Sequence, residues 1–509
     1  MAFRRSSVRF RLAPPARISL LGGHIPIPRY SLCDPLSPIA ILAIVTLAPR
    51  NAITIPDQIA NRRGQRVGKN LPTSKARPPL QTHAMLAVLC LLNALLSLLV
   101  IVYGFDYAYP AEWRFAIYRG ASVIFLAGLA ALAILSPRAI RGPDADLVQI
   151  ERAGTLFCAW QLALNLFFHL PTVTAIAAIL VLAAVIAACF HRIIKSAYWA
   201  AFATWVACAL YYMRHHPLGE GADMLPFITH AISVAAHGGN PYTADYSSIT
   251  DNPFYYLPYQ WLLYFPAWLI GCDLRVINVI CAVACVLVIE IAAGRIARLP
   301  AFLYPFLLCS FTIPMMVEGE LWPYWLCILS VALLLLRGRV RAGVVVLAIT
   351  VGIRQTALVP LAVIMVMLLG QMHLRAWLRL SVLVGLAGGI MPVIATLAWG
   401  PSMWRTILID GPRIGAAKSL LIHNPLNQIG ASNFVAYAGL SQRASLIQAA
   451  MAVLLLGVAF LYAGRGNKNL LCCTGLIYTV VMSFNPFIHV YYYLSGLMIF
   501  AAGLAYQES

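Results

Sequence analysis

The sequence predicts an all-α membrane protein that crosses the bilayer many times. Of the 509 residues, 61% are hydrophobic and only 10% are charged, so no soluble surface can be built once a core has been filled. The apolar runs extend to about 16 to 22 residues, which suits transmembrane helices, whereas membrane strands alternate over about ten residues. We therefore expect a bundle of about 14 transmembrane helices, with interfacial or re-entrant helices in the first large outer loop.

The first 84 residues differ from the rest of the chain. They hold 13 Lys and Arg against two acidic residues, lack a periodic apolar pattern, and contain one apolar run, "IAILAIVTLA", that is too short to span a bilayer. We expect residues 1–84 to be disordered. Their composition also fits a transit peptide or a nucleic-acid-binding arm. However, "RSSVRFRLAPPA" resembles a bacterial tRNA gene read as protein, in which case translation begins at Met85 and the segment is not part of the true protein.

Apolar runs that end in charged, Pro- or Gly-containing loops give the order of the expected spans. Four additional spans lie in residues 85–190, and the remaining ones belong to a domain over residues 191–509. In chain order, the spans are expected near residues 85–103, 116–136, 152–170, 172–190, 196–213, 274–293, 301–316, 321–336, 342–353, 355–370, 378–399, 446–464, 469–484 and 488–505.

The stretch "FYYLPYQWLLYFPAWLIG", residues 254–271, is apolar but contains Pro258 and Pro266. If this stretch does not cross the bilayer, the short loops that contain Arg and Lys all lie on one side of the membrane. The positive-inside rule identifies that side as cytoplasmic. We therefore expect an interfacial or re-entrant segment. Most acidic residues and two large loops, 214–273 and 400–445, then lie on the opposite face, where function is expected. The expected location is the cytoplasmic membrane of a bacterium, with an outward-facing site.

The stretch "GADMLPFITHAISVAAHGGNPY", residues 221–242, has an unusual polar pattern. Asp223, His230 and His237 recur at seven-residue steps, which places them near one face of a helix that the following glycine pair closes. Side chains seven residues apart lie about 10 Å apart along the axis, too far to share one ion. A divalent metal is therefore not favoured, and no cofactor is expected with certainty. As a helix N-cap, Asp223 would have a purely structural role.

Further motifs follow this stretch in a recognisable order. "GGNPY" and "YYLPY" come first, "EGELWPYWLCILS" precedes "GRVRAGVVVLAITVGIRQTALVPLAVI", and "FNPFIHVYYYLSGLM" lies near the C-terminus. In order and spacing, these motifs resemble glycosyltransferase family 87 over residues 196–505. The resemblance implies a GT-C fold and inverting transfer of a sugar, mannose or another hexose or pentose, from a polyprenyl-phosphate donor to an acceptor on the outer face. It also implies that Asp223 is the general base that takes the acceptor proton.

Arg354 is the candidate cation for the departing phosphate. It lies between the apolar runs 342–353 and 355–370, at a turn that the topology directs to the outer leaflet, where a charge is costly unless it is paired. The family pattern usually has lysine at this position. Arginine keeps the positive charge and can form two parallel hydrogen bonds to a phosphate. We place the neighbouring Gln355 in the same substrate-binding set. An arginine that snorkels to the interface without touching substrate is the alternative.

The remaining binding candidates are Glu320, Tyr242, Tyr256, His237 and His489. The glutamate, with Glu318, begins a span on the outer side, where a second acidic group would contact substrate or metal, although a solvated helix start has the same pattern. The tyrosines could stack on a sugar or anchor the chain at the interface. A structural histidine is the alternative for His489.

Two other classes of function stay open. A transporter or flippase of lipid-linked sugars would place ionisable groups near the bilayer midplane, often within repeated halves, but the sequence has no internal repeat and most acidic residues lie outside the spans. A non-catalytic membrane scaffold that keeps the fold is the other. For the enzyme, the expected partners are membrane lipids, a polyprenyl-phosphate-linked sugar and a glycolipid or glycan acceptor, with no nucleic acid.

Overall fold

The computed structural model describes residues 87–96, 111–135, 194–219, 223–249, 254–294, 299–307, 317–319, 321–410, 429–463, 466–485 and 490–505. All regular structure in these stretches is helical, as the sequence predicts. The chain divides into two units, Met1–Arg62 and Arg63–Ser509, and every described residue belongs to the second.

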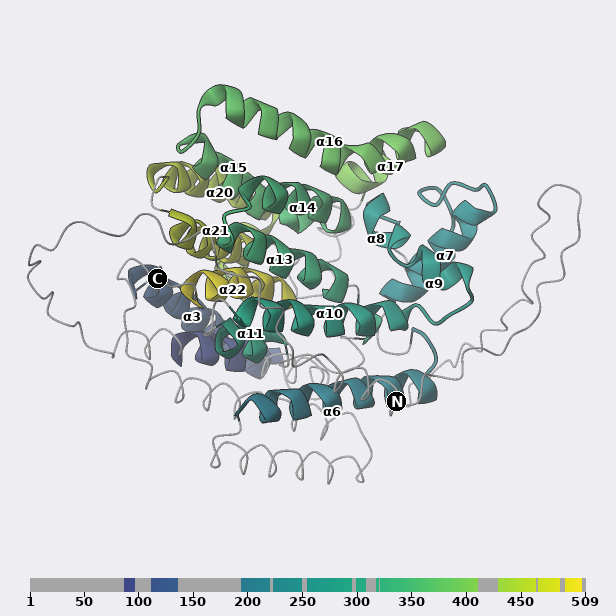
Figure 1. The fold of residues 1–509 in the computed structure, drawn as a ribbon, viewed down its shortest axis with the longest axis horizontal. Coiled ribbons are helices and arrows are strands. Elements are labelled where there is room, and N and C mark those ends of the chain that lie inside the picture. The colour runs from purple at the N-terminus through teal and green to yellow at the C-terminus, as the bar shows by residue number, and fades with distance from the viewer. Residues whose placement is uncertain are drawn as a thin grey trace, which may run out of the picture. The chain divides into compact units, whose positions relative to one another are not determined.

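The colours of Figure 1 follow the described helices in chain order, from purple to yellow. A first helix covers residues 87–96. The others, in chain order, are α3 (Ala111–Leu135), α6 (Ile194–His215), α7 (Met224–Ala236), α8 (Pro258–Leu262), α9 (Phe265–Leu269), α10 (Arg275–Ala293), α11 (Leu299–Leu307), α13 (Leu321–Leu336), α14 (Val340–Ile353), η1 (Gln355–Ala357), α15 (Leu358–Leu369), α16 (Leu374–Trp399), α17 (Ser402–Arg405), η2 (Thr406–Asp410), α19 (Ala431–Tyr437), η4 (Ser441–Arg443), α20 (Ala444–Leu461), α21 (Gly466–Ser483) and α22 (Val490–Ala505).

The predicted boundaries of the later spans agree with the helices to within a few residues. The expected spans 342–353 and 355–370 correspond to α14 and to η1 with α15, and the span expected at 378–399 begins earlier, with α16 at Leu374. Helix α11 ends at Leu307. The predictions for residues 1–84, 152–170, 172–190 and 308–316 lie outside the described residues. The total of about 14 transmembrane helices stays a prediction.

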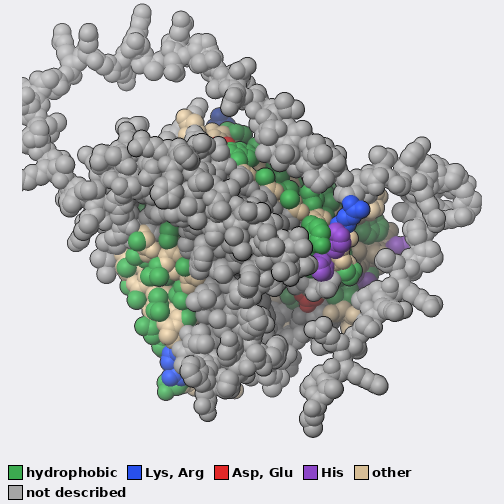
Figure 2. All heavy atoms as spheres, turned by 90° about the horizontal axis from the view of Figure 1, so that it is seen from below, with side chains coloured by type: hydrophobic (Ala, Val, Ile, Leu, Met, Phe, Trp, Pro, Cys, Tyr) green, Lys and Arg blue, Asp and Glu red, His purple; other side chains and the backbone are tan. Residues whose placement is uncertain are grey.

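Within the described residues, three helices are long and apolar enough to cross a membrane: α10, α16 and α20. In the most apolar windows of α16 and α20, only 17% and 11% of the residues are buried, so their outer faces are rows of exposed Leu, Ile and Val. Hydrophobic side chains also make up much of the described surface visible in the space-filling view (Figure 2). Water disfavours such surfaces and hydrocarbon accepts them, so we describe the chain as a helical membrane protein.

The aromatic stretch 254–271 forms two short helices, α8 and α9, each with a proline in its first turn. A proline is tolerated there because the first amide groups of a helix have no intrahelical partner. Five-residue helices separated by a turn cannot cross a bilayer as one continuous rod. The prediction that this stretch is not an ordinary span therefore agrees with the structure.

Close helix pairs define two ends of the bundle. Helices α21 and α22 run antiparallel, with Gly475 packed on the backbone of α22 and Gly503 on that of Cys472. Helices α13 and α14 form a hairpin, and the chain turns back again between α14 and α15. Because the ring of Tyr259 lies on Gly352, α8 is at the end of the bundle where α14 finishes. In Figure 1, α7, α8 and α9 lie together at this end.

The basic turn between α13 and α14 therefore lies at the other end of the bundle. Arg337 and Arg339 precede α14, whose fourteen residues extend about 21 Å before reaching α8. This separation agrees with the predicted segregation of basic turns from the large loop over residues 214–273. The other basic turns of the prediction are not placed by this comparison, so the one-sided arrangement of all of them stays a prediction.

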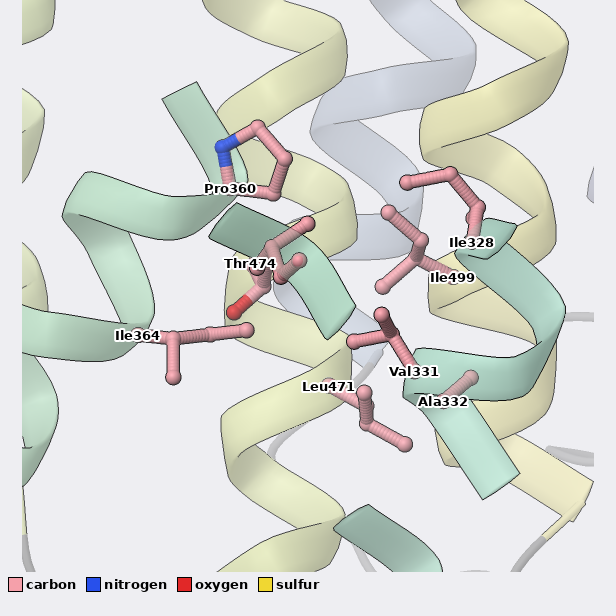
Figure 3. A pocket seen from close by; sticks show the side chains of 9 residues that line it. Ile328, Val331, Ala332, Pro360, Ile364, Leu471, Thr474 and Ile499 are labelled. Atoms are coloured by element: carbon pink, nitrogen blue, oxygen red, sulfur yellow. The ribbon is translucent and has the colours of Figure 1, made fainter. Parts of the chain in front are cut away.

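One region of the interior between these ends is apolar. A small pocket is lined by five helices, and its lining is hydrophobic except for one threonine (Figure 3). That side chain, Thr474, donates its hydrogen bond to the carbonyl of Leu470 in the preceding turn. This pocket therefore offers packing surface without a polar site. The lining residues are Ile328, Val331, Ala332, Leu347, Pro360, Ile364, Leu471, Thr474 and Ile499.

A buried ionic network ties the loop to the bundle. Arg275, at the first residue of α10, forms ion pairs with Asp273 at 2.6 Å and with Glu318 at 3.2 Å. Its guanidinium also donates to the carbonyls of Met213 and His216 at the end of α6. Arg275 is 3% exposed and Glu318 is fully buried, so these charges are stabilised mainly by one another. Glu318 is therefore a structural carboxylate and not part of a solvated helix start.

Asn278, one turn further along α10, strengthens the same connection. Its amide donates to the carbonyls of Val317 and Gly319, and its oxygen accepts a hydrogen bond from the hydroxyl of Tyr264. The turn before α13 is thus held by a salt bridge to Glu318 and by hydrogen bonds from the Asn278 side chain to two backbone carbonyls.

We predict that Arg275→Met strongly destabilises the protein, because Asp273 and Glu318 lose their shared cation. Removing one partner of a buried ion pair costs about 3–5 kcal/mol. Thermal unfolding of the purified protein in detergent measures the effect. Arg405→Met is the matched control, since Arg405 is 77% exposed and its pair with Asp410 spans 3.7 Å. Equal unfolding midpoints for the two variants would contradict the structural role of Arg275.

Candidate functional site

The described part of the loop over residues 214–273 builds a core of its own. Apolar residues of α7, α8 and the intervening turns pack together with Ala395 of α16 and with Met403 and Ile407 beyond it. Asn240 fixes one edge of this core, since its amide donates to the carbonyl of Trp399 at 3.0 Å and to Ser402 Oγ at 2.9 Å. The loop is therefore a packed layer on the end of the bundle.

The loop tyrosines proposed to contact a sugar belong to this core. Tyr242 and Tyr256 are 4% and 7% exposed. The hydroxyl of Tyr242 donates to the carbonyl of Tyr256 at 3.1 Å and lies 3.5 Å from the indole nitrogen of Trp261. Burial raises the pKa of Tyr242 well above its usual value, so its hydroxyl stays protonated and acts as a donor. Both side chains stabilise the loop and present little surface to a ligand.

Asp223 lies at the exposed start of α7. Its backbone carbonyl accepts the amide of Phe227, but its carboxylate makes no capping hydrogen bond. The purely structural N-cap role is therefore not observed. A surface carboxylate that is not used for capping can accept a proton from a bound hydroxyl group.

The two histidines of the seven-residue pattern lie further along α7 than Asp223 and have partners within the loop. Helix α7 ends at Ala236 and is followed by Gly238 at φ +77°, a conformation that glycine readily adopts. Because His237 follows Asp223 by almost four helical turns, it lies about 20 Å further along the helix axis. His237 is exposed, and its Nδ1 lies 2.7 Å from the carbonyl of Ser233. His230 packs edge-on against Tyr246. Placing His237 in one substrate pocket with Asp223 is not supported by this geometry.

Metal ligands do not gather in the part of the chain that the structure describes. No group of three or more His, Cys, Asp or Glu side chains there has an arrangement suited to one ion. Among the acidic residues of the loop, Asp245 is fully exposed, and hydrogen bonding from the backbone amide of Ser247 lowers the pKa of its carboxyl group. Asp245 therefore remains ionised without a metal.

Arg354 lies where α14 breaks and the chain turns into α15. Its backbone is extended, with φ −145° and ψ 119°, and its side chain is 8% exposed. The guanidinium donates to Tyr492 Oη at 3.0 Å, and its central carbon is 4.7 Å from the Tyr492 ring centroid and 5.8 Å from that of Tyr324. Aromatic faces stabilise a guanidinium in such surroundings. Arg354 is thus held inside the bundle, which does not fit an arginine that snorkels outward.

A continuous series of contacts runs from Arg354 to the start of α7. The exposed Gln355 donates from Nε2 to the carbonyl of Tyr255 at 3.2 Å. The Tyr255 ring lies 6.3 Å from that of Phe227, which is one helical turn from Asp223. The structure therefore brings Arg354, Gln355 and Asp223 to the same end of the bundle.

Some site residues were missed or are not described. Tyr324 and Tyr492, which enclose Arg354, were within quoted motifs, but aromatic residues near helix starts are also typical of interface anchors. Both residues are far from Arg354 in the sequence, so no spacing pattern could predict that they contact it. Glu320 and His489 lie outside the described residues, so their assignments stay predictions.

Comparisons with known proteins do not identify the chain: no protein-family model matches it, and neither a curated protein nor a solved structure matches it.

We predict that Gly352→Ala disturbs the site, because a Cβ at residue 352 would overlap the ring of Tyr259. The ring cannot move freely, since its hydroxyl donates to the carbonyl of Ala387 at 2.7 Å. Overpacking of this kind costs about 1–3 kcal/mol. Thermal unfolding in detergent should show a lower midpoint.

Gly385→Ala is the control for this prediction. A Cβ at residue 385 of α16 meets no atom within 4 Å, so the change should be neutral or stabilising by up to about 1 kcal/mol. If Gly352→Ala unfolded at the same temperature as Gly385→Ala, the packing of α8 on α14 would need revision.

Proposed function

We propose that the protein is an integral-membrane glycosyltransferase that moves a sugar from a polyprenyl-phosphate donor to an acceptor at the extracytoplasmic surface. The observation that carries the proposal is that an exposed carboxylate, Asp223, and a buried cation, Arg354, lie at the same end of the bundle. The motif resemblance to glycosyltransferase family 87 points to the same pair of residues. A bacterial cytoplasmic membrane is the proposed location.

The two residues have complementary tasks in an inverting transfer. The acceptor hydroxyl attacks the anomeric carbon, and its proton passes to the carboxylate of Asp223. The new bond joins the acceptor oxygen to the sugar, while the bond between the anomeric carbon and the donor phosphate oxygen breaks. The electron pair of that bond leaves with the polyprenyl phosphate. The guanidinium of Arg354 stabilises the departing anion, so no general acid is required.

The surroundings of Arg354 suit this role. A guanidinium has only donors and stays charged at all physiological pH values, so it favours an anionic ligand. Its contacts with Tyr492 and Tyr324 fix its position, which reduces the reorganisation needed when negative charge develops. Gln355 lies beside it at the surface and provides a polar group for the donor or acceptor.

We predict that Asp223→Asn lowers transfer of labelled sugar by about 10²- to 10⁴-fold, because an amide cannot accept the acceptor proton. The assay uses purified protein, a radiolabelled polyprenyl-phosphate sugar and membrane lipid acceptors. Asp245→Asn is the matched control, since it removes an exposed loop carboxylate that is bonded to the backbone of Ser247. Full activity of the Asp223→Asn protein would rule out the assignment of the base.

We predict that Arg354→Ala lowers kcat/KM for the donor by about 10²- to 10³-fold, the usual loss when a group that stabilises a developing anion is removed. Arg354→Lys keeps the charge and should retain part of the activity. Steady-state kinetics with varied donor concentration measure both effects. Unchanged donor kinetics in the alanine variant would remove Arg354 from the site, and vesicle exchange of donor without transfer would favour a transporter.

A further inference from the structure

The two short helices that follow α16 expose an apolar side that has no part in the mechanism above. In α17 and η2, Trp404, Leu408 and Ile409 are 37%, 65% and 58% exposed, and Arg405 among them is 77% exposed. Positions 404 and 408, like 405 and 409, lie about one helical turn apart, so the four side chains share one side of the segment. We refer to these four residues as the α17–η2 face.

The opposite side of the segment is fixed to the loop over residues 214–273. Met403 and Ile407 belong to the core of that loop, and the buried hydroxyl of Thr406 donates to the carbonyl of Tyr242 at 3.4 Å. The segment cannot rotate to bury its apolar side without breaking this packing. The α17–η2 face is therefore a fixed part of the surface.

The α17–η2 face continues the exposed apolar surface of α16. Gly400, at φ +72°, turns the chain after α16, and α17 lies beside the end of that helix (Figure 1). The indole of Trp404 bonds back across this turn, since its Nε1 donates to Thr396 Oγ1 at 2.7 Å. Next to Thr396, Leu397 is 83% exposed and ends a row of exposed side chains along one face of α16. The other members of the row are Leu386, Ile390 and Val393.

The length of α16 places this turn at the level of the lipid headgroups. Arg379 lies in the second turn of α16, and a basic side chain near the end of a span reaches the headgroup region. From Arg379 to Trp399 the helix extends about 30 Å, which matches the thickness of the hydrocarbon core. We therefore expect Trp399 and the turn at Gly400 to lie at the opposite headgroup layer.

The composition of the α17–η2 face suits the headgroup layer better than water or hydrocarbon. Water disfavours two adjacent exposed aliphatic side chains beside an exposed tryptophan. Hydrocarbon disfavours the guanidinium of Arg405 and the carboxylate of Asp410, which lie 3.7 Å apart. Tryptophan and arginine beside aliphatic residues are typical of segments that lie at the boundary between headgroups and acyl chains.

We propose that the α17–η2 face is an interfacial anchor that lies in the phospholipid headgroup layer. Leu408 and Ile409 contact the acyl chains, and Arg405 contacts lipid phosphates. Through Met403 and Ile407, the anchor holds the core of the loop, and with it the start of α7, at the membrane surface. The inference is independent of the proposed glycosyltransferase function, because it rests on burial, composition and the length of α16.

Fluorescence quenching of Trp404 tests the anchor. The full-length protein and its Trp404→Phe variant are reconstituted into phosphatidylcholine nanodiscs, and the difference between their emission spectra isolates Trp404. Phosphatidylcholine brominated close to the headgroup should quench this difference signal more strongly than lipid brominated near the chain ends. Acrylamide, which quenches from the aqueous phase, should have little effect.

Trp322→Phe is the matched control. Trp322 is fully buried within α13, so its difference signal should resist both brominated lipid and acrylamide.

Leu408→Asp perturbs the contact while Trp404 stays in place. A carboxylate on the α17–η2 face should lift the segment towards water. Quenching of Trp404 by bromine close to the headgroup should therefore fall about twofold, and quenching by acrylamide should rise. The Trp404 signal is again isolated by difference, against a protein that carries both Leu408→Asp and Trp404→Phe.

Several results would overturn the inference. Quenching of Trp404 by acrylamide without quenching by brominated lipid places the α17–η2 face in water. Quenching by neither reagent shows that a protein surface covers it. Strongest quenching by bromine near the chain ends places it inside the hydrocarbon, and unchanged quenching in the Leu408→Asp protein shows that Leu408 does not contact lipid.

Discussion

The burial of one guanidinium, that of Arg354, sets the geometry of the rest of the site. A permanent charge inside an apolar bundle is tolerated only where donors, acceptors and aromatic faces surround it. Here the chain leaves the helical conformation at residue 354 and turns back. Helices α14 and α15 are therefore both short, and the end of α14 and the start of α15 lie at the same end of the bundle. Tyr259 packs on Gly352 just before this break, which places α8 at the end of the bundle where Arg354 lies.

The loop that contains α7, α8 and α9 packs on the end of the bundle as a layer with its own hydrophobic core. Aromatic rings fill its core, and the hydroxyl of Tyr242 and the amide of Asn240 bond to backbone groups within the loop and on α16. A loop organised in this way holds Asp223 in a defined position at the rim. Its rigidity comes from packing and satisfied hydrogen bonds, because α7, α8 and α9 are each too short to be stable alone.

The sequence predicts the positions of the helices in this protein better than it predicts which residues of different helices contact one another. Apolar run length locates the helices, and a charge between the runs that became α14 and α15 singles out Arg354. Contacts between distant positions leave no such trace. Arg275 is 43 residues from Glu318, and Arg354 is 138 residues from Tyr492, so neither pairing could be inferred from spacing. Aromatic residues were equally ambiguous, since core tyrosines such as Tyr242 and interface anchors have the same composition. The regular spacing of His237 from Asp223 aligns the two side chains but also separates them along the helix, so spacing alone does not place both at one site.

The network around Arg275 also has a consequence for biogenesis. Its acceptors at the end of α6 are made first, the arginine follows 62 residues after Met213, and Glu318 is made another 43 residues later. During synthesis, the arginine reaches the membrane surface with Asp273 and two backbone carbonyls before its buried carboxylate partner exists. The connection between the early and late helices can therefore close only after the polypeptide preceding α13 has been inserted, which makes assembly of this membrane protein sequential.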